Sequence, residues 1–405
     1  MNIYSKDFNL TDDSHYILVR DIADGFLEKK LSMQVLLVIS QGIDLFEALG
    51  AYLAISKLKL MCYKGKALRI AILMNLIHEH NRLRPSSDTN PNGENSLENK
   101  IDQLKWLFEG TDIEYKLIYV SGNCPWGSDD VLDFELERIM SKNVIHIKIE
   151  DYIIGNSYVK NQKGGEIIFG IRSILQMDGY PDNGFFDCML FTDADMTFDL
   201  SQIGTLLDGY FSGKKLIIGN RMDPQSILVK NMTRAGDGVL MYRHIQRKLA
   251  PGFFMDKNLH DTQCPWKFLS RSVLADIEPE LDSMDWAIDT DILSAAGKHG
   301  YLVYITYVTA IDSELESHGK AIGHFRRNRT IIEGTIHQAE KYGLEYDKEI
   351  AGLVRKYLKT DEDYRKLLEA GLPPSLSSLP NRDWGRSNLI TVSLVENWLM
   401  EILNV

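Results

Sequence analysis

Short apolar runs alternate with stretches of helical spacing along the middle of this chain. The runs have the length of buried strands, and they lie at residues 67–74, 115–120, 144–149, 186–191, 215–219 and 301–308. Helical patterns separate several of them, at about 96–108, 165–177, 201–211 and 289–298. Strands that are buried on both faces and joined by helices form parallel sheets through right-handed crossovers. The sequence therefore predicts an α/β fold with a mostly parallel sheet flanked by helices.

Both ends of the chain are expected to be helical. Apolar residues recur at helical spacing through the first sixty residues, and helical patterns return near Gly323, apart from a loop at 373–387. We therefore predict an N-terminal helical extension, an α/β catalytic domain and a C-terminal helical extension, at residues 1–62, 63–322 and 323–405. The extensions are candidates for acceptor binding, for covering the site or for forming a homo-oligomer.

Composition and charge exclude several classes of protein. The formal net charge is −12, with 57 acidic against 45 basic side chains, which argues against a nucleic-acid-binding surface. The four cysteines include no C-x-x-C pair, so neither a zinc site nor a disulfide framework is expected. The N-terminus lacks the layout of a signal peptide, and charged residues interrupt the most apolar stretch, at 33–60. We expect a cytoplasmic protein without a membrane span, for which peripheral membrane association stays open.

Two carboxylates follow directly after one of the predicted buried strands. Asp193 and Asp195 come after the run 186–191, with Ala194 between them. In an extended chain, residues two apart point to the same side, and ligand sites of open α/β sheets lie at the carboxyl ends of strands. Mg²⁺ and Mn²⁺ prefer carboxylate, phosphate and water oxygens. The pair therefore predicts a divalent-metal site, although two acidic residues in a turn also occur for structural reasons alone.

Three motifs in order resemble the family 2 glycosyltransferases of GT-A fold. They are Phe191-Thr-Asp-Ala-Asp195, Asp261-Thr-Gln-Cys-Pro-Trp-Lys-Phe268 and Trp286-Ala-Ile-Asp-Thr-Asp-Ile-Leu293. The resemblance covers roughly residues 67–322 and is greatest to the dolichyl-phosphate β-glucosyltransferase branch. It implies a GT-A, Rossmann-like domain and a hexosyltransferase that takes its sugar from a UDP- or GDP-sugar donor. It also implies an Mg²⁺ or Mn²⁺ cofactor at the D-x-D motif.

The resemblance implies roles for the residues that match the donor half of the family site. Asp193 would lie near the ribose and the metal, and Asp195 would bind the metal directly. Lys163, in a segment similar to the family's N-x-K-G-x, would approach the nucleotide or its phosphates, where free amides at a helix start also attract anions. Lys320 is a candidate partner of the diphosphate. His318, beside it, is a candidate third metal ligand.

A second group of residues is expected around the donor sugar and the acceptor. Asp289 matches the family's aspartate near the acceptor and is the candidate base of an inverting transfer, unless it only caps its helix. Asp291 replaces the family's glutamate. Asp261 and Gln263 would shape the sugar pocket through hydrogen bonds. Three further candidates come from residue chemistry, and each has an equally ordinary structural alternative: Arg221 as a phosphate fork or a salt bridge, and Trp266 and Trp286 as sugar-facing rings or core residues.

The chain departs from the family pattern at two strand ends. A long polar loop, residues 78–95, replaces the usual turn after the first strand, and 121–128 replaces the acidic D-D-G-S turn, which leaves Asn123 as the candidate contact to the base. The branch's membrane segment has no counterpart, so a polyprenyl-phosphate acceptor is not expected. Three alternatives to an inverting transferase stay open. They are a retaining synthase of the glucosyl-phosphoglycerate or mannosylglycerate type, a sugar nucleotidyltransferase, and a non-catalytic nucleotide-binding protein.

Overall fold

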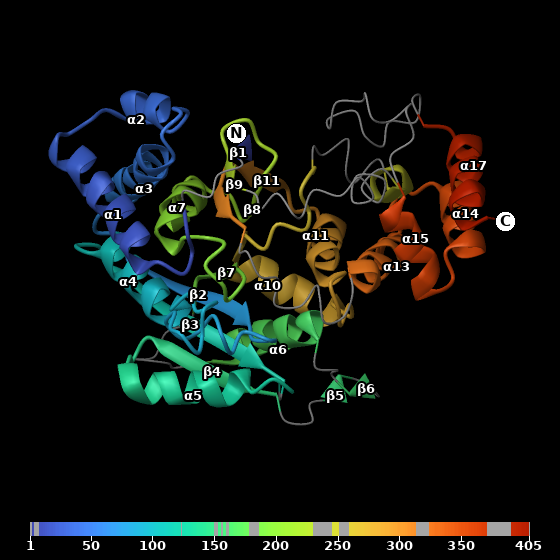
Figure 1. The fold of residues 1–405 in the computed structure, drawn as a ribbon, viewed down its shortest axis with the longest axis horizontal. Helices are drawn as coiled ribbons and strands as arrows, with labels where there is room; N and C mark the ends of the chain where they lie inside the picture. The colour runs from blue at the N-terminus through green and yellow to red at the C-terminus, as the bar shows by residue number, and fades with distance from the viewer. Residues whose placement is uncertain are drawn as a thin grey trace.

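The computed structural model describes residues 2–3, 8–122, 124–149, 153–154, 157–158, 162–177, 186–229, 245–250, 259–312, 324–370 and 390–404. Its centre is a seven-stranded sheet (Figure 1). From one edge to the other, the strands are β11 (Val303–Thr306), β8 (Leu216–Gly219), β10 (Lys267–Ser270), β7 (Cys188–Phe191), β2 (Leu68–Asn75), β3 (Ile113–Ser121) and β4 (Val144–Lys148). β10 runs antiparallel to both of its neighbours, and every other pair is parallel. The prediction of a mostly parallel sheet is confirmed.

Helices cover both faces of this sheet. In β2, Ile70, Ile72 and Met74 belong to one buried cluster, and Ala71 and Leu73 belong to another. The first cluster includes residues of α3 (Leu45–Met61), α4 (Ser96–Phe108) and α7 (Gly204–Phe211), and the second includes residues of α6 (Lys163–Gln176), α10 (Arg271–Ile277) and α11 (Ile288–Lys298). Period-two alternation thus divides each central strand between two apolar layers. The continuous apolar character of the strands follows from burial on both sides.

The N-terminal helices pack into the first apolar layer (blue in Figure 1). They are α1 (Asp13–Glu28), α2 (Met33–Ile39) and α3, as the helical pattern predicts. Ser56 of α3 donates a 2.6 Å hydrogen bond to the carbonyl of Ser201, so this extension shares the core of the α/β domain. A small parallel sheet was not predicted: β1 (Asn2–Ile3) pairs with β9 (Ile227–Val229), which pairs with β12 (Thr309–Ile311).

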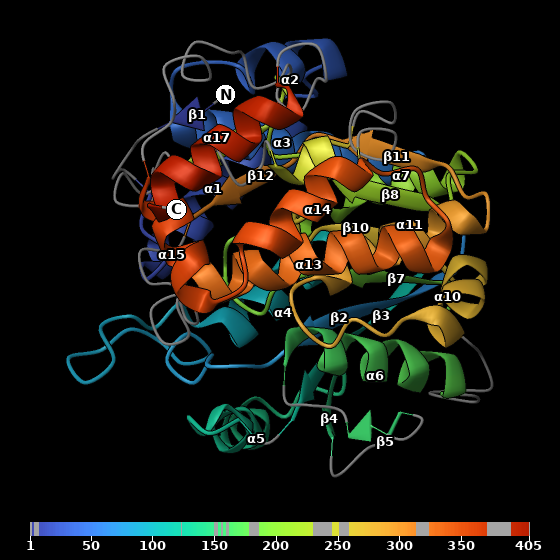
Figure 2. The same cartoon turned by 90° about the vertical axis from the view of Figure 1, so that its right-hand side faces the viewer.

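The C-terminal extension lies at the opposite end of the molecule (orange and red in Figure 1). It comprises α13 (His324–Tyr342), α14 (Lys348–Tyr357), α15 (Asp361–Glu369) and α17 (Val392–Leu403), which form their own apolar cluster. Figure 2 shows α13 lying against α11. No helix in the described ranges is both long and apolar enough to cross a membrane. The predicted loop at 373–387 lies outside the described residues.

Several smaller elements complete the fold. α5 (Ser128–Ile139) precedes β4 and has no counterpart among the predicted helices. A two-stranded antiparallel pair joins β5 (Ile153–Ile154) to β6 (Ser157–Tyr158). Two 3₁₀ turns, η1 (Leu200–Ile203) and η3 (Glu278–Glu280), begin or end longer helical segments. η1 follows directly after the segment that contains the aspartate pair.

Candidate active site

The aspartate pair lies where the carboxyl ends of two parallel strands meet. β7 ends at Phe191, immediately before Asp193 and Asp195, and β2 runs parallel beside it. The loop after β2 therefore emerges next to the pair. β10 is antiparallel to β7, and its first residue, Lys267, lies opposite Phe191. The strand order thus gathers residues from three separate parts of the sequence at one edge of the sheet.

Asp195 is held by an arginine from the loop after β2. Arg82 Nη1 lies 2.5 Å from Asp195 Oδ2, and the amide of Thr197 donates to Asp195 Oδ1 at 3.0 Å. Arg82 also pairs with Glu79, at 2.8 Å, and both its side chain and that of Asp195 are mostly buried. Burial alone would raise the pKa of Asp195, but the charges of Arg82 and Lys100 outweigh it and hold that pKa below its usual value. Asp195 is therefore ionised and fixed in place.

Asp193 is the more accessible member of the pair. Its side chain is 35% exposed, against 14% for Asp195. Its carboxylate lies 3.8 Å from the ammonium group of Lys163, which opens α6. Burial raises the pKa of Asp193, and the negative charges of Asp195 and Asp289 add to that rise, while Lys163 opposes it. A positive charge added nearby would therefore stabilise the ionised form of Asp193 more than that of Asp195.

Asp289 lies at the centre of a buried group of three charges. Lys163 Nζ lies 2.9 Å from its Oδ2, and Lys267 Nζ forms a short hydrogen bond with its Oδ1. The Asp289 and Lys267 side chains are 1% and 0% exposed. Burial alone would raise the pKa of Asp289, but the two lysines outweigh it and lower the pKa.

This environment does not suit the predicted role of Asp289 as a base. A general base must reach the proton that it accepts, and its pKa should lie near the working pH. Asp289 is closed off from solvent, and both of its oxygens accept hydrogen bonds from ammonium groups. Its geometry instead positions Lys163, whose own pKa is raised by Asp289 and Asp193 against the opposing effect of burial.

Two predicted site residues, one assigned to the nucleotide and one to the sugar pocket, bind each other. Arg221 makes a bidentate pair with Asp261, with both nitrogen–oxygen distances at 2.8 Å, and the Arg221 amide donates to the same carboxylate at 2.9 Å. The salt-bridge alternative for Arg221 is therefore the one that the structure shows. Gln263 lies close by, and its Nε2 donates to the hydroxyl of Thr290 at 3.2 Å.

Three further candidate site residues lie in surroundings typical of the protein core. Trp266 is fully buried and stacks on Phe198, with ring centroids 5.4 Å apart, so the core alternative is the one that the structure favours for it. Trp286 is partly buried and packs against the apolar cluster of the C-terminal helices. Asp291 is fully buried and accepts hydrogen bonds from two backbone amides and from the hydroxyl of Tyr342, at 2.6 Å. Its carboxylate is committed to holding α11 against α13, which corrects its assignment to the acceptor pocket.

Three predicted site residues lie outside the described part of the chain. They are Asn123, the candidate base contact, and His318 and Lys320, the candidate metal ligand and diphosphate partner. The described site therefore consists of Asp193, Asp195 and Lys163, with Arg82, Asp289 and Lys267 around them.

The aspartate pair fits a divalent cation as part of a ligand set. Both residues offer the hard oxygen donors that Mg²⁺ and Mn²⁺ prefer, and Asp193 is accessible. A cation there would also relieve the repulsion that raises the pKa of Asp193. Within the ranges that the structure describes, no three His, Cys, Asp or Glu side chains form a group that could hold a metal. Phosphate oxygens and water would therefore have to supply much of the coordination.

Sequence reasoning missed the residues that hold the aspartates. Lys267 gave a usable signal, because a lysine inside the apolar run of β10 must be paired when the strand is buried. Arg82 gave a weaker signal, because it belongs to the long polar loop 78–95, whose position beside β7 depends on the strand order. A second acidic partner for Arg82, here Glu79, is expected once Arg82 is known to be buried, because a buried guanidinium needs more than one acceptor.

The chain matches no protein-family model, and no curated protein sequence matches it. A comparison with solved structures finds partial similarity to several of them. One is glucosyl-3-phosphoglycerate synthase from Mycobacterium tuberculosis with Mn²⁺, UDP-glucose and phosphoglyceric acid, at 13% identity and TM-score 0.45, covering 72% of this chain and 84% of that one. Another is mannosyl-3-phosphoglycerate synthase from Rubrobacter xylanophilus, at 12% identity and TM-score 0.43, covering 71% and 79%.

A third is a mannosyltransferase from Pyrobaculum calidifontis with GDP-mannose and Mn²⁺, at 12% identity and TM-score 0.39, covering 90% of this chain and 99% of that one. At identities and TM-scores this low, the similarities assign neither a substrate nor a residue role to this chain.

Proposed function

We propose that this chain is a metal-dependent glycosyltransferase that transfers a hexose from a UDP- or GDP-sugar to an acceptor hydroxyl or phosphate. One observation carries the proposal. An accessible carboxylate, Asp193, and a partly buried lysine, Lys163, lie 3.8 Å apart at the carboxyl edge of the sheet, beside the fixed carboxylate of Asp195. A diphosphate with a divalent cation is a ligand that can satisfy all three charges at once.

Each described residue has a distinct part in this proposal. Asp193 and Asp195 would hold the Mg²⁺ or Mn²⁺, which when bound supplies Lewis-acid stabilisation of the departing nucleoside diphosphate. Arg82 fixes the Asp195 carboxylate, so that its position is set before the donor binds. Lys163 stands at the start of α6, where its charge and the helix N-terminus both favour phosphate oxygens. Asp289 binds the ammonium group of Lys163, and Lys267 in turn holds Asp289 in place.

The environment of Asp289 favours the retaining alternative for stereochemistry. An inverting transfer needs a base on the acceptor side, and the predicted base is buried and ion-paired. In a retaining transfer the acceptor approaches from the side of the leaving diphosphate, so a base on the opposite side of the sugar is not required, which fits the retaining synthase alternative. Membership of family 2, the identity of the base and of the acceptor, the cytoplasmic location, peripheral membrane association and homo-oligomer formation stay predictions.

The test is donor turnover by the purified chain with Mn²⁺ and a panel of UDP- and GDP-sugars. We expect slow hydrolysis of at least one donor, and a loss of about 100-fold or more in Asp193→Asn and in Lys163→Met, which remove charges that face the diphosphate. Asp208→Asn, at a partly exposed carboxylate of α7 that pairs with Lys59, is the matched control and should keep full turnover. With a simple alcohol as acceptor, the anomeric configuration of the product, read by NMR, separates retention from inversion.

Two outcomes would contradict the proposal. One is that no nucleotide sugar is bound or turned over by the folded chain with either cation. The other is that Asp193→Asn turns over donor at the rate of the Asp208→Asn control.

A further inference from the structure

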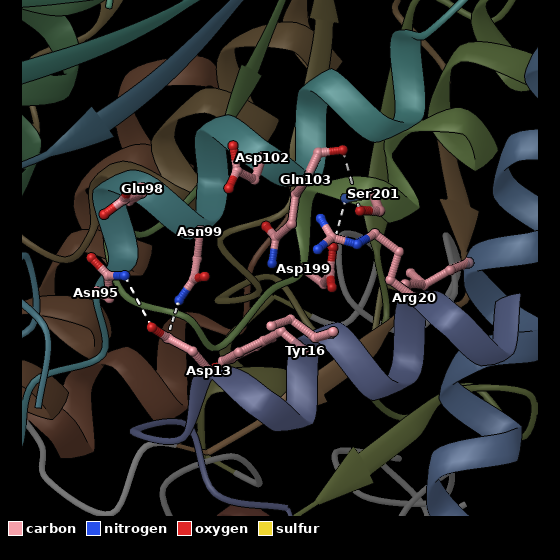
Figure 3. A pocket seen from close by; sticks show the side chains of 12 residues that line it. Asp13, Tyr16, Arg20, Asn95, Glu98, Asn99, Asp102, Gln103, Asp199 and Ser201 are labelled. Atoms are coloured by element: carbon pink, nitrogen blue, oxygen red, sulfur yellow. Dashed lines mark hydrogen bonds between the residues drawn. The ribbon is translucent and has the colours of Figure 1, made fainter. Parts of the chain in front are cut away.

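A second polar cavity lies between the N-terminal extension and the catalytic domain. It has a volume of about 360 Å³ and is lined by α1, α4 and the segment around η1 (Figure 3). None of the residues placed at the candidate active site lines it. Its size falls within the range of small-molecule sites. It is therefore a separate space that the proposed function does not use.

A buried amide donor points into this cavity without a partner. Gln103 projects from α4 towards α1 (Figure 3), and the residue is only 6% exposed. Its Oε1 accepts a hydrogen bond from the amide of Leu200, at 3.0 Å, which fixes the orientation of the side-chain amide. Its Nε2 has no hydrogen-bond partner among the described residues. A buried donor that is fixed in place and unpaired calls for an acceptor from a ligand or solvent.

Acceptors and a further donor face the same space. Asn95 donates through Nδ2 to Asp13, at 3.1 Å, and its buried Oδ1 has no partner among the described residues. Arg20 of α1 lines the cavity and makes no hydrogen bond within the described ranges. Asp199 accepts from the amide of Ser201, at 2.7 Å, through only one of its two oxygens. The lining therefore offers both donors and acceptors at close range.

The charges of the lining argue against a strongly charged ligand. Two of its four carboxylates are already paired with cations, Glu98 with Arg138 at 3.1 Å and Asp102 with Lys105 at 3.0 Å. The remaining carboxylates, Asp13 and Asp199, are partly offset by Arg20, so the lining repels an anion and has only a small net charge with which to attract a cation. A hydroxyl group both donates and accepts, so a neutral molecule with several hydroxyls can satisfy every group named above. Apolar surface from Tyr16, Ile17 and Leu53 lies alongside and suits the C–H face of a sugar ring.

We propose that this cavity is a second carbohydrate-binding site, which takes a neutral mono- or disaccharide apart from the nucleotide-sugar site. The segment of the aspartate pair forms its wall, because Asp199 follows Asp195 by four residues in the chain. Glu94, the neighbour of Asn95, accepts a hydrogen bond from the amide of Met196 at 2.8 Å. The saccharide would thus bind to the back of the segment whose front holds the donor.

The test is saturation-transfer NMR on the full chain with glucose, mannose, maltose and trehalose, without nucleotide or divalent cation. At least one saccharide should bind, and Gln103→Glu should weaken it by about tenfold or more, because this change keeps the acceptor for Leu200 and replaces the donor by an acceptor. Gln34→Glu, at an exposed glutamine of α2, is the matched control and should bind as the wild type does. Asp193→Asn should also bind it unchanged, which separates this site from the donor site.

Arg20→Met is a second variant, which tests the site if Gln103→Glu fails to fold. Arg20 makes no hydrogen bond in the described structure, so its loss should leave the fold intact and still weaken saccharide binding several-fold. The proposal is overturned if no neutral saccharide binds, or if the folded variants of Gln103 and Arg20 bind it as tightly as the wild type. It is also overturned if inorganic phosphate or spermidine competes for the site and saccharides do not.

Discussion

Replacing Asp289 by asparagine removes the single negative charge that lies between two buried ammonium groups. Lys267 is fully buried, and its other hydrogen-bond partner is the carbonyl of Cys264, at 2.7 Å. Lys163 retains Asp193, but only at 3.8 Å. The asparagine has nearly the same shape, so it creates no cavity. Its one oxygen can serve one lysine, while its NH₂ group faces the other with the wrong polarity.

The expected loss of stability follows from these distances and from burial. At 2.9 Å, the attraction between Lys163 and Asp289 is about 6 kcal/mol with an effective dielectric constant of about 20. The cost of removing both charges from water offsets most of this attraction in the wild type. In the variant, that cost persists for Lys267 without its counter-charge. We therefore expect Asp289→Asn to lower the free energy of unfolding by about 3–5 kcal/mol.

Urea denaturation, followed by circular dichroism at neutral pH, measures this change. The control is Asp208→Asn, which removes a partly exposed carboxylate charge 3.3 Å from Lys59. The asparagine oxygen can still accept the hydrogen bond from the Tyr63 hydroxyl, so this change should cost no more than about 1 kcal/mol. Adding Lys267→Met to Asp289→Asn should restore part of the lost stability, because the double variant no longer buries an uncompensated charge.

The reasoning fails if Asp289→Asn is as stable as the Asp208→Asn control. It also fails if Lys267→Met makes Asp289→Asn less stable rather than more. If Asp289→Asn folds with full stability but loses donor turnover, Asp289 acts in catalysis and its ion pairs are not its main role.

Three further predictions follow from the same part of the molecule. Gly164→Ala should lower the free energy of unfolding by about 2–3 kcal/mol, because its methyl group would collide with the backbone that precedes α11. Gly25→Ala, in an open stretch of α1, is its control and should raise stability by about 0.5–1 kcal/mol; equal effects in urea denaturation would contradict the steric argument. Tyr342→Phe should cost about 1–3 kcal/mol in the same assay, since it removes the 2.6 Å hydrogen bond to Asp291, and a neutral effect would show that the bond contributes nothing. Because the pKa of Asp289 lies below its ordinary value, its stabilisation is complete above the ordinary carboxyl range and is lost as the pH falls towards the lower pKa of the folded state. The acid limb of unfolding free energy against pH should therefore be shallower in Asp289→Asn, and an unchanged limb would refute this.

Strands were the part of the fold that the sequence predicted best. The run 67–74 corresponds to β2 at Leu68–Asn75, and 215–219 corresponds to β8 at Leu216–Gly219, because uninterrupted apolar residues of that length require burial on both faces. The helix at 96–108 also agrees with α4, Ser96–Phe108. β1 and β9 were not predicted, because strands of two or three residues are too short to show a hydrophobic periodicity. α5 escaped because its apolar residues do not gather on one buried face: three of its four buried residues are polar or charged, and Phe134 is exposed.

The candidate site was predictable only in the part that depends on local sequence. The position of Asp193 and Asp195 at a sheet edge could be predicted from the apolar strand before them. The position of Lys163 could be predicted from the helix that starts there. What those carboxylates face depends on which strands are neighbours, and the apolar runs do not encode their order. Arg221 and Asp261 were assigned separate tasks, although they form one bidentate pair, because 40 residues separate them in the sequence.

The loop 78–95 is a structural brace for the aspartate pair as well as a departure from the family pattern. Arg82 holds Asp195, and Glu94 accepts from the amide of Met196, so both ends of the segment 195–196 are tied to this loop. Asn95, the next residue, binds Asp13 of α1 and thereby connects the brace to the N-terminal extension. A shorter turn after β2 could not reach these partners. The long loop and the added N-terminal helices are therefore parts of one arrangement that fixes the position of Asp195, and neither is expected to be replaceable alone.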